Sequence, residues 1–193
     1  MDKLPVYIVA GGRGKRFGSD KACALVGGVP MISRVAEALG PVAESVKVVA
    51  ASAGAYDDLG LVTIADLRPG RGPLGGLDTA LSDRVANYGE GWLLLTACDL
   101  AQPDVGLARC LFSHVRDDAQ VVAFKGERWE PLLAMYHSSI RPMVRRRIDA
   151  GRGALWRLIE QTHHVRVPLP DGVPGIAQIN TRDDLRHFEP GVD

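Results

Sequence analysis

The densest group of chemically useful residues lies near the amino terminus. An apolar run at residues 6–10 leads directly into a loop of glycines and cations. The glycines are Gly11, Gly12, Gly14 and Gly18, and the cations are Arg13, Lys15, Arg16 and Lys21. Glycine lets the backbone reach positive φ and approach a ligand closely, and successive N–H groups can form an anion site. This composition predicts a loop that holds a triphosphate.

Two widespread phosphate-binding patterns do not fit this loop. The P-loop pattern requires Ser or Thr after Gly-Lys, and here Arg16 follows Lys15. The dinucleotide pattern G-x-G-x-x-G requires a glycine where the chain has Phe17. These misfits argue against a P-loop enzyme and against a nicotinamide-dependent oxidoreductase. The plainer alternative is a tight turn with a solvated basic face, which the density of glycine and charge after an apolar strand disfavours.

Short apolar runs alternate with amphipathic stretches along the chain, which indicates an α/β fold. Strands are predicted at residues 6–10, 46–50, 61–65, 92–96, 120–124, 130–136 and 163–167, and helices at 30–39, 75–85, 103–115, 140–150 and 154–161. A last helix is predicted to begin after Thr181, which with Asp184 resembles a capping box. The strand at 130–136 opens near a proline, as edge strands can. The run 145–147, three arginines, is predicted to be a solvated helix face.

Two aspartates follow predicted strands of the sheet. In an open parallel sheet, ligands bind at the carboxyl ends of strands, which is where Asp66 and Asp99 fall. Either aspartate alone is more often a turn or helix-cap residue. Beside a triphosphate loop, however, a Mg²⁺ ion is expected, and it takes one or two carboxylates together with phosphate oxygens. Asp99 is therefore the predicted Mg²⁺ ligand, and Asp66 is expected to share the metal or to face the nucleophile.

Bulk composition narrows the class of protein. The chain has 193 residues, which suggests one domain, and 46% of them are hydrophobic, as in a globular protein. Lys plus Arg and Asp plus Glu both number 23, so a large nucleic-acid footprint is not expected. The 3 cysteines have neither disulfide-framework nor zinc-site spacing. No apolar run is long enough for a signal peptide or a membrane span, so a cytoplasmic protein is predicted.

Taken in order, these segments resemble the molybdenum cofactor guanylyltransferases, which are nucleotidyltransferases of the sugar-nucleotide pyrophosphorylase type. That family opens with Leu-Ala-Gly-Gly-x-Ser-x-Arg-Met-Gly and a following Asp-Lys, matched here by residues 9–18 and 20–21. Further matches are Gly-Pro-Leu-x-Gly-Leu at 72–77, Cys-Asp at 98–99, Glu-Pro-Leu-x-Ala-x-Tyr at 130–136 and Asn-x-x-Asp-Asp-Leu at 180–185. Gly14 replaces the family's Ser and Phe17 its Met. Residues 50–52, Ala-Ala-Ser, stand where many relatives have an Asn near the base, so GTP is favoured but CTP stays open.

The resemblance implies a three-layer, Rossmann-like α/β fold with a mostly parallel central sheet. It implies one domain, residues 1–193, in which residues 1–124 bind nucleotide and residues 125–193 bind the acceptor. It also implies the reaction: Mg²⁺-dependent transfer of GMP from GTP to molybdopterin, with release of pyrophosphate. Transient contact with other cofactor-biosynthesis proteins or with the recipient molybdoenzyme fits the same role.

Most site residues follow from the same matches, and Arg152 is added as a further candidate outside them. The nucleotide is expected to contact Ala10, Gly11, Gly12, Arg13, Gly14, Lys21, Asp66, Gly72, Pro73, Leu74 and Asp99. Catalysis is assigned to Arg16, Lys21 and Asp99, and the acceptor to Asn180 with Arg152. Two alternatives remain: a related nucleotidyltransferase that uses CTP or a sugar phosphate, and a non-catalytic nucleotide-binding protein of this fold.

Overall fold

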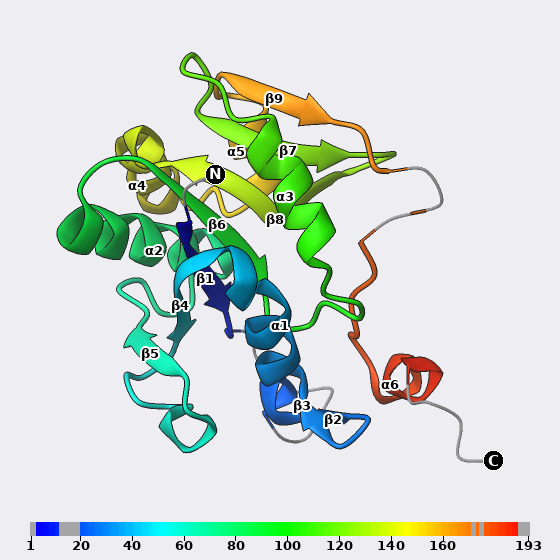
Figure 1. Ribbon diagram of the computed structural model, residues 1–193. Helices are drawn as coiled ribbons and strands as arrows, with labels where there is room; N and C mark the ends of the chain where they lie inside the picture. The colour runs from blue at the N-terminus through cyan, green and yellow to red at the C-terminus, as the bar shows by residue number, and fades with distance from the viewer. Residues whose placement is uncertain (1–2, 12–19, 171–172, 174–175, 189–193) are drawn as a thin grey trace.

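A single large sheet forms the centre of the protein. The computed structural model describes residues 3–11, 20–170, 173 and 176–188. Its seven-stranded sheet has the order β5-β4-β1-β6-β8-β7-β9 (Figure 1). The strands are β1 (Leu4–Val9), β4 (Ala43–Ala50), β5 (Val62–Ala65), β6 (Trp92–Ala97), β7 (Val121–Lys125), β8 (Trp129–His137) and β9 (His164–Val167). Only β8 runs antiparallel to its neighbours, so the sheet is mostly parallel as predicted.

Helices cover both faces of the sheet and complete three layers. The helices on the sheet are α1 (Met31–Leu39), α2 (Pro73–Tyr88), α3 (Val105–Ser113), α4 (Arg141–Asp149) and α5 (Leu155–Ile159), whereas α6 (Arg182–Phe188) lies away from the sheet near the C-terminus (Figure 1). Successive side chains of a strand point to opposite faces. Accordingly, Val6 and Ile8 of β1 pack in one core with α1 and α3, whereas Tyr7 and Val9 pack in a second core with α2, α4 and α5. The predicted three-layer α/β fold is confirmed.

The prediction of an edge strand at residues 130–136 is wrong, because β8 lies inside the sheet. It pairs with β6 on one side and with β7 on the other. Pro131 is tolerated because the ladder to β6 extends only as far as Leu133, and the ladder to β7 is irregular between Ala123 and Lys125. Proline in a sheet needs such an interruption, since it has no N–H to donate.

The same sheet contains strands from both halves of the chain. The strand β7 spans the predicted boundary near residue 124, and β8 and β9 follow it into the sheet. The division into a nucleotide part and an acceptor part therefore stays a proposal about function. Within the described residues, no helix is both long and apolar enough to cross a membrane. A cytoplasmic location and the lack of a nucleic-acid partner stay predictions from the sequence.

Candidate functional site

The carboxyl ends of the parallel strands meet at one edge, and backbone hydrogen bonds fix the loops that leave them. The amide of Ala10 donates to the Val49 carbonyl at 2.9 Å, and the amide of Asp66 donates to the Ala50 carbonyl at 2.7 Å. The amide of Cys98 donates to the carbonyl of Val9 at 3.3 Å. As the sequence predicted from the strand ends, Ala10, Asp66 and the Cys98-Asp99 pair therefore leave the same edge of the sheet.

Three polar side chains from distant parts of the sequence meet at this edge. The ammonium nitrogen of Lys21 donates to Asp99 Oδ2 at 2.5 Å and to Asn180 Oδ1 at 3.0 Å. The Lys21 and Asp99 side chains are 20% and 15% exposed, so the ion pair is partly shielded from water. The other carboxylate oxygen, Asp99 Oδ1, is buried and has no hydrogen-bond partner within the described part of the chain. A buried, unpaired carboxylate oxygen is costly and marks a place where a ligand can bind.

Asn180 reaches this cluster because the segment before it is held against the loop after β6. Leu100 and Gln178 form an isolated antiparallel bridge. The Ile179 amide donates to the Asp99 carbonyl at 2.9 Å. Ile179 itself is fully buried in a small core with Val26, Met31 and Ala101. The backbone therefore fixes Asn180 beside Asp99, which sequence spacing alone could not establish.

The last helix begins with the predicted capping box. The amide of Asp184 donates to Thr181 Oγ1 at 3.1 Å, and the Thr181 amide donates to Asp184 Oδ2 at 2.8 Å. The amide of Asn180 donates to the same carboxylate oxygen at 2.8 Å. This reciprocal pairing is the capping-box geometry, and it restrains the backbone that carries the Asn180 side chain.

Glu130 contributes to the same C-terminal segment. Burial raises the pKa of Glu130, and a hydrogen bond with the backbone of Ile176, together with the charge of Arg128, opposes that rise. The family motif at residues 130–136 thus has a structural role here, since its glutamate contacts the segment that leads to Asn180.

Sequence reasoning missed Tyr56, which holds Asp20 and thereby helps to position Lys21. Lys21 opens a short 3-10 turn, η1 (Lys21–Cys23), and Asp20 caps it by accepting from the amide of Ala22 at 3.0 Å. The second Asp20 oxygen accepts from the hydroxyl of Tyr56 at 2.8 Å. Tyr56 is only 4% exposed and packs in the core with Cys98. No sequence pattern links Tyr56 to Asp20, because the contact joins loops 36 residues apart.

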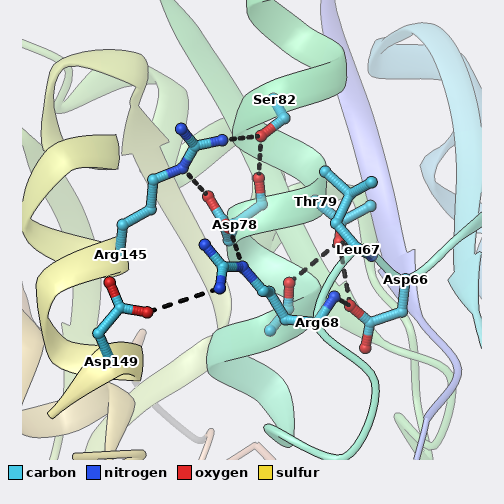
Figure 2. A network of polar contacts seen from close by, with 9 residues as sticks. Asp66, Leu67, Arg68, Asp78, Thr79, Ser82, Arg145 and Asp149 are labelled. Carbon is cyan, nitrogen blue, oxygen red and sulfur yellow. Dashed lines mark hydrogen bonds and ion pairs between the residues drawn. The ribbon is translucent and has the colours of Figure 1, made fainter.

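Asp66 makes the contacts of a turn-forming residue. Its Oδ1 accepts from the backbone of Arg68 at 2.8 Å and from Thr79 Oγ1 at 3.1 Å (Figure 2). Thr79 Oγ1 also accepts from the amide of Leu67 at 2.9 Å. The carboxylate therefore shapes the loop that precedes α2. Thr79 was not predicted, although a threonine in the second turn of a helix that follows an aspartate-led loop is the signal that could have found it.

The glycines of the loop before α2 allow close packing. Gly72 has φ +62° and precedes Pro73, the first helical residue. A Cβ on Gly75 would lie 2.8 Å from the Arg68 carbonyl oxygen, and one on Gly76 would lie 2.9 Å from a methyl of Val9. The start of α2 therefore lies directly against the end of β1. Leu74 is completely buried, so it packs in the core beneath this loop.

A network of charges lies beside this loop, between α2 and α4 (Figure 2). Asp78, on α2, is 1% exposed and accepts from Arg145 Nε of α4 at 3.0 Å. Its other oxygen is 3.4 Å from Arg68 Nε. Arg68 also lies 3.5 Å from Asp149 at the end of α4. The predicted solvated face at residues 145–147 is therefore wrong for Arg145, which is tied into this network.

Some of the remaining predicted residues are described by the structure, and others lie outside the described residues. Gly11 is exposed, and a Cβ built on it would have open space around it. Gly12, Arg13, Gly14 and Arg16 lie outside the described residues. Arg152 is exposed in the loop between α4 and α5. Within the described chain, Arg152 has no side-chain contact with Lys21, Asp99 or Asn180.

The cluster at this edge fits a hard cation that is held mainly by its substrate. No group of three or more His, Cys, Asp or Glu residues in the described chain is arranged to hold a metal by itself. Carboxylate and amide oxygens are the ligands that Mg²⁺ prefers, and Mg²⁺ keeps phosphate oxygens and waters around it. Asp99 Oδ1, which is buried and has no hydrogen-bond partner among the described residues, meets that need.

Cys98 is buried directly before Asp99 and packs in the core with Tyr56. Burial, and then the charge of Asp99, raise the pKa of its thiol to about 12. Its contribution visible in the structure is packing beside Asp99.

Comparison with known proteins extends these observations. Residues 6–166 match the family described as the MobA-like NTP transferase domain. A Carboxydothermus hydrogenoformans protein named "Probable molybdenum cofactor guanylyltransferase" is 38% identical over 149 residues, covering 77% of this chain and 73% of the relative. The molybdenum cofactor guanylyltransferase of Serratia proteamaculans is 27% identical over 194 residues, covering 97% and 95%.

A solved structure has the same fold. Molybdopterin-guanine dinucleotide biosynthesis protein A from Archaeoglobus fulgidus superposes with a TM-score of 0.77 at 23% identity, covering 96% of this chain and 97% of that one. The family match spans most of the chain and includes Lys21, Asp66 and Asp99. It also agrees with the resemblance first drawn from the motifs. The chain is therefore a nucleotidyltransferase with a MobA-like NTP transferase domain, and it belongs to the molybdenum cofactor guanylyltransferase family.

Proposed function

We propose that this protein transfers GMP from GTP to molybdopterin with the help of Mg²⁺ and releases pyrophosphate. The observation that carries the proposal is the cluster of Lys21, Asp99 and Asn180. Lys21 comes from the nucleotide loop, and Asn180 comes from the C-terminal segment expected to meet the acceptor. A single ammonium group contacts both Asp99 and Asn180, so the two substrates would meet at Asp99.

The reaction needs two anions brought together. A phosphate oxygen of the acceptor bonds to the α-phosphorus of GTP, and the bond from that phosphorus to the bridging oxygen breaks. Pyrophosphate leaves with the electron pair. The attacking phosphate is already largely ionised near neutral pH, because its second pKa is about 6, so no general base is required. The work of the protein is therefore positioning and charge neutralisation.

Lys21 supplies one of the neutralising charges. When nucleotide enters, its ammonium group can exchange Asp99 for phosphate oxygens, which form charge-assisted hydrogen bonds. Arg16 is proposed for the same triphosphate through its bidentate guanidinium. Asp99 would hold Mg²⁺ through the oxygen that has no hydrogen-bond partner in the described chain. A bound Mg²⁺ supplies Lewis-acid polarisation of the phosphate oxygens.

The backbone of two loops is proposed to hold the nucleotide. The amides of Gly11, Gly12, Arg13 and Gly14, which follow Ala10, would bind the phosphates. Asp66 and the segment 72–74 would lie beside the base and ribose. Because the Asp66 Oδ1 atom already serves Arg68 and Thr79, only Oδ2 is proposed for the nucleotide. Asn180 is proposed to contact the acceptor. Arg152 is proposed as a second contact outside the cluster.

The decisive experiment is a transfer assay with molybdopterin as the acceptor. GTP and CTP are compared, each with and without Mg²⁺, and both the dinucleotide product and pyrophosphate are measured. We expect product from GTP only when Mg²⁺ is present. Product from CTP alone would change the base assignment, and nucleotide binding without any product would favour a non-catalytic protein of this fold.

A further inference from the structure

A second basic site lies between α4 and α5, apart from the carboxyl-edge cluster. A cavity of about 360 Å³ is lined by Arg147, Arg152 and Arg157, by Gln161, and by residues 151, 153 and 154. Among the described residues, its lining contains three cations and no carboxylate. Nothing assigned above uses Arg147, Arg157 or Gln161.

Arg147 is a built part of this cavity and not a solvated side chain. It is only 6% exposed, so the predicted solvated face is wrong for this residue too. Its Nη1 donates to Gln161 Oε1 at 2.6 Å, and its Nη2 donates to the Ala154 carbonyl at 3.4 Å. Its Nε is buried and has no hydrogen-bond partner in the described part of the chain. Two neutral oxygens thus hold the guanidinium, and no carboxylate of the described residues compensates its charge.

A nearby arginine, Arg145, has its charge compensated by a carboxylate. Arg145, two residues earlier on α4, pairs with the buried Asp78. By contrast, no ion pair in the described chain involves Arg147, Arg152 or Arg157. Burial, and then the charges of Arg152 and Arg157, lower the pKa of Arg147. Buried cations are normally paired, so three cations around one cavity create a field that an incoming anion would relieve.

We propose that this cavity binds a phosphate-class dianion through Arg147, Arg152 and Arg157. Arginine forks match the oxygens of a phosphate group bidentately and stay charged at all working pH values. The anion can be free inorganic phosphate or pyrophosphate, or the phosphate group of the acceptor. The acceptor source rests on the proposed function, whereas the anion site itself does not.

The binding test needs no turnover. Inorganic phosphate is titrated by calorimetry into the wild-type protein, the double variant R152Q/R157Q and the control R146Q. Arg146 lies on the same helix and is exposed, and it does not line the cavity. Phosphate held at the nucleotide loop is common to all three proteins, so their difference isolates this cavity. Arg152 and Arg157 are also exposed, so their replacement should leave the fold intact.

We expect the double variant to bind phosphate at least about tenfold more weakly than the wild type, because each lost guanidinium removes charge-assisted hydrogen bonds. R146Q should match the wild type. Equal affinity in all three proteins, or no measurable phosphate binding in any, would overturn the proposal.

A kinetic arm identifies the source of the anion. The kinetic arm uses R157Q, because Arg152 is already proposed for the acceptor. If the acceptor's phosphate occupies the cavity, R157Q raises the KM for molybdopterin and leaves the KM for GTP unchanged. If R157Q leaves both KM values unchanged although it weakens phosphate binding, the occupant is a free phosphate-class anion. A protein that shows the phosphate difference but forms no dinucleotide keeps the anion site and refutes the proposed function, so the two failures can be told apart.

Discussion

Two aspartates near the carboxyl edge of the sheet, Asp99 and Asp78, have the same side chain and opposite surroundings. Asp78 is buried on α2, with arginines at 3.0 and 3.4 Å from its two oxygens. Asp99 follows β6, shares one oxygen with a single lysine and has a second, buried oxygen without a partner in the described chain. Neither Asp78 Oδ2 nor Asp99 Oδ1 has a hydrogen-bond partner in the described chain. Asp78 Oδ2 still has the Arg68 guanidinium 3.4 Å away, whereas no ion pair in the described chain involves Asp99 Oδ1, so the protein itself supplies a cation to each oxygen of Asp78 and to only one oxygen of Asp99.

This difference follows from what holds each partner. Arg145 and Arg68 both pair with Asp78. Arg145 Nη2 also donates to Ser82 Oγ at 3.4 Å, and Ser82 lies on α2 with Asp78. Lys21 lies on a short turn beside the nucleotide loop and can exchange a carboxylate for a phosphate without breaking a helix. Of the two cations at Asp78, Arg145 comes from helix α4 and Arg68 from the loop before α2, so a helix holds at least one of them, whereas the single cation at Asp99 comes from a short turn. Variants at the two positions should separate a structural role from a chemical one.

Asp99→Asn should have the largest effect, and it should be on activity. Asparagine keeps the shape but loses the charge that a divalent cation needs. Losing one group that stabilises transition-state charge costs roughly 10²–10³-fold in kcat, and the free energy of unfolding should change little. Transfer kinetics and urea denaturation on the same sample measure both quantities. The control Asp118→Asn, an exposed position before β7, should behave as wild type, and full activity in Asp99→Asn would remove the metal assignment.

Asp78→Ala should show the reverse pattern. Breaking a buried ion pair costs about 3–5 kcal/mol, and the low end applies because the Arg68 and Arg145 side chains are 38% and 39% exposed and can regain water. We expect about 3 kcal/mol less stability in chemical denaturation. Asp149→Ala removes the 65% exposed partner of Arg68 and should cost less than about 1 kcal/mol. Equal losses in the two variants would mean that burial is not what distinguishes Asp78.

Lys21→Ala should weaken nucleotide use without unfolding the protein. One hydrogen bond to a charged group contributes about 1.5–3 kcal/mol, which corresponds to about 10- to 150-fold in kcat/KM for GTP. Lys3→Ala, at an exposed position near the start of β1, is the matched control. Unchanged kcat and KM would take Lys21 out of the site and leave its contact with Asp99 purely structural.

Sequence patterns predicted the elements and the strand-end aspartates because these depend on local periodicity. The same patterns misplaced β8, since the tolerance of Pro131 depends on where two ladders stop.

Asp78 was missed although a signal existed: it falls among the apolar positions Leu74, Leu77 and Leu81 of α2, all fully buried. A charged residue on a buried apolar stripe needs a partner of opposite charge. That this partner is Arg145 depends on how α4 packs against α2, which the sequence does not show. Contacts between distant loops, such as the one between Tyr56 and Asp20, have no local pattern at all.

Tyr56→Phe tests that last contact and should give the smallest effect. The variant removes only the hydroxyl that holds Asp20 Oδ2. The free energy that keeps Asp20, and with it Lys21, in the binding position should fall by about 0.5–1.5 kcal/mol, as for one hydrogen bond. Burial, and then the hydrogen bond to Asp20, raise the pKa of Tyr56 above its ordinary value, so the hydroxyl stays a donor throughout the working pH range. The loss should therefore appear as a higher KM for GTP at every pH tested. Tyr88→Phe removes a hydroxyl that contacts Ser45 and should leave this KM unchanged. If Tyr56→Phe also leaves it unchanged, Asp20 alone sets the position of Lys21.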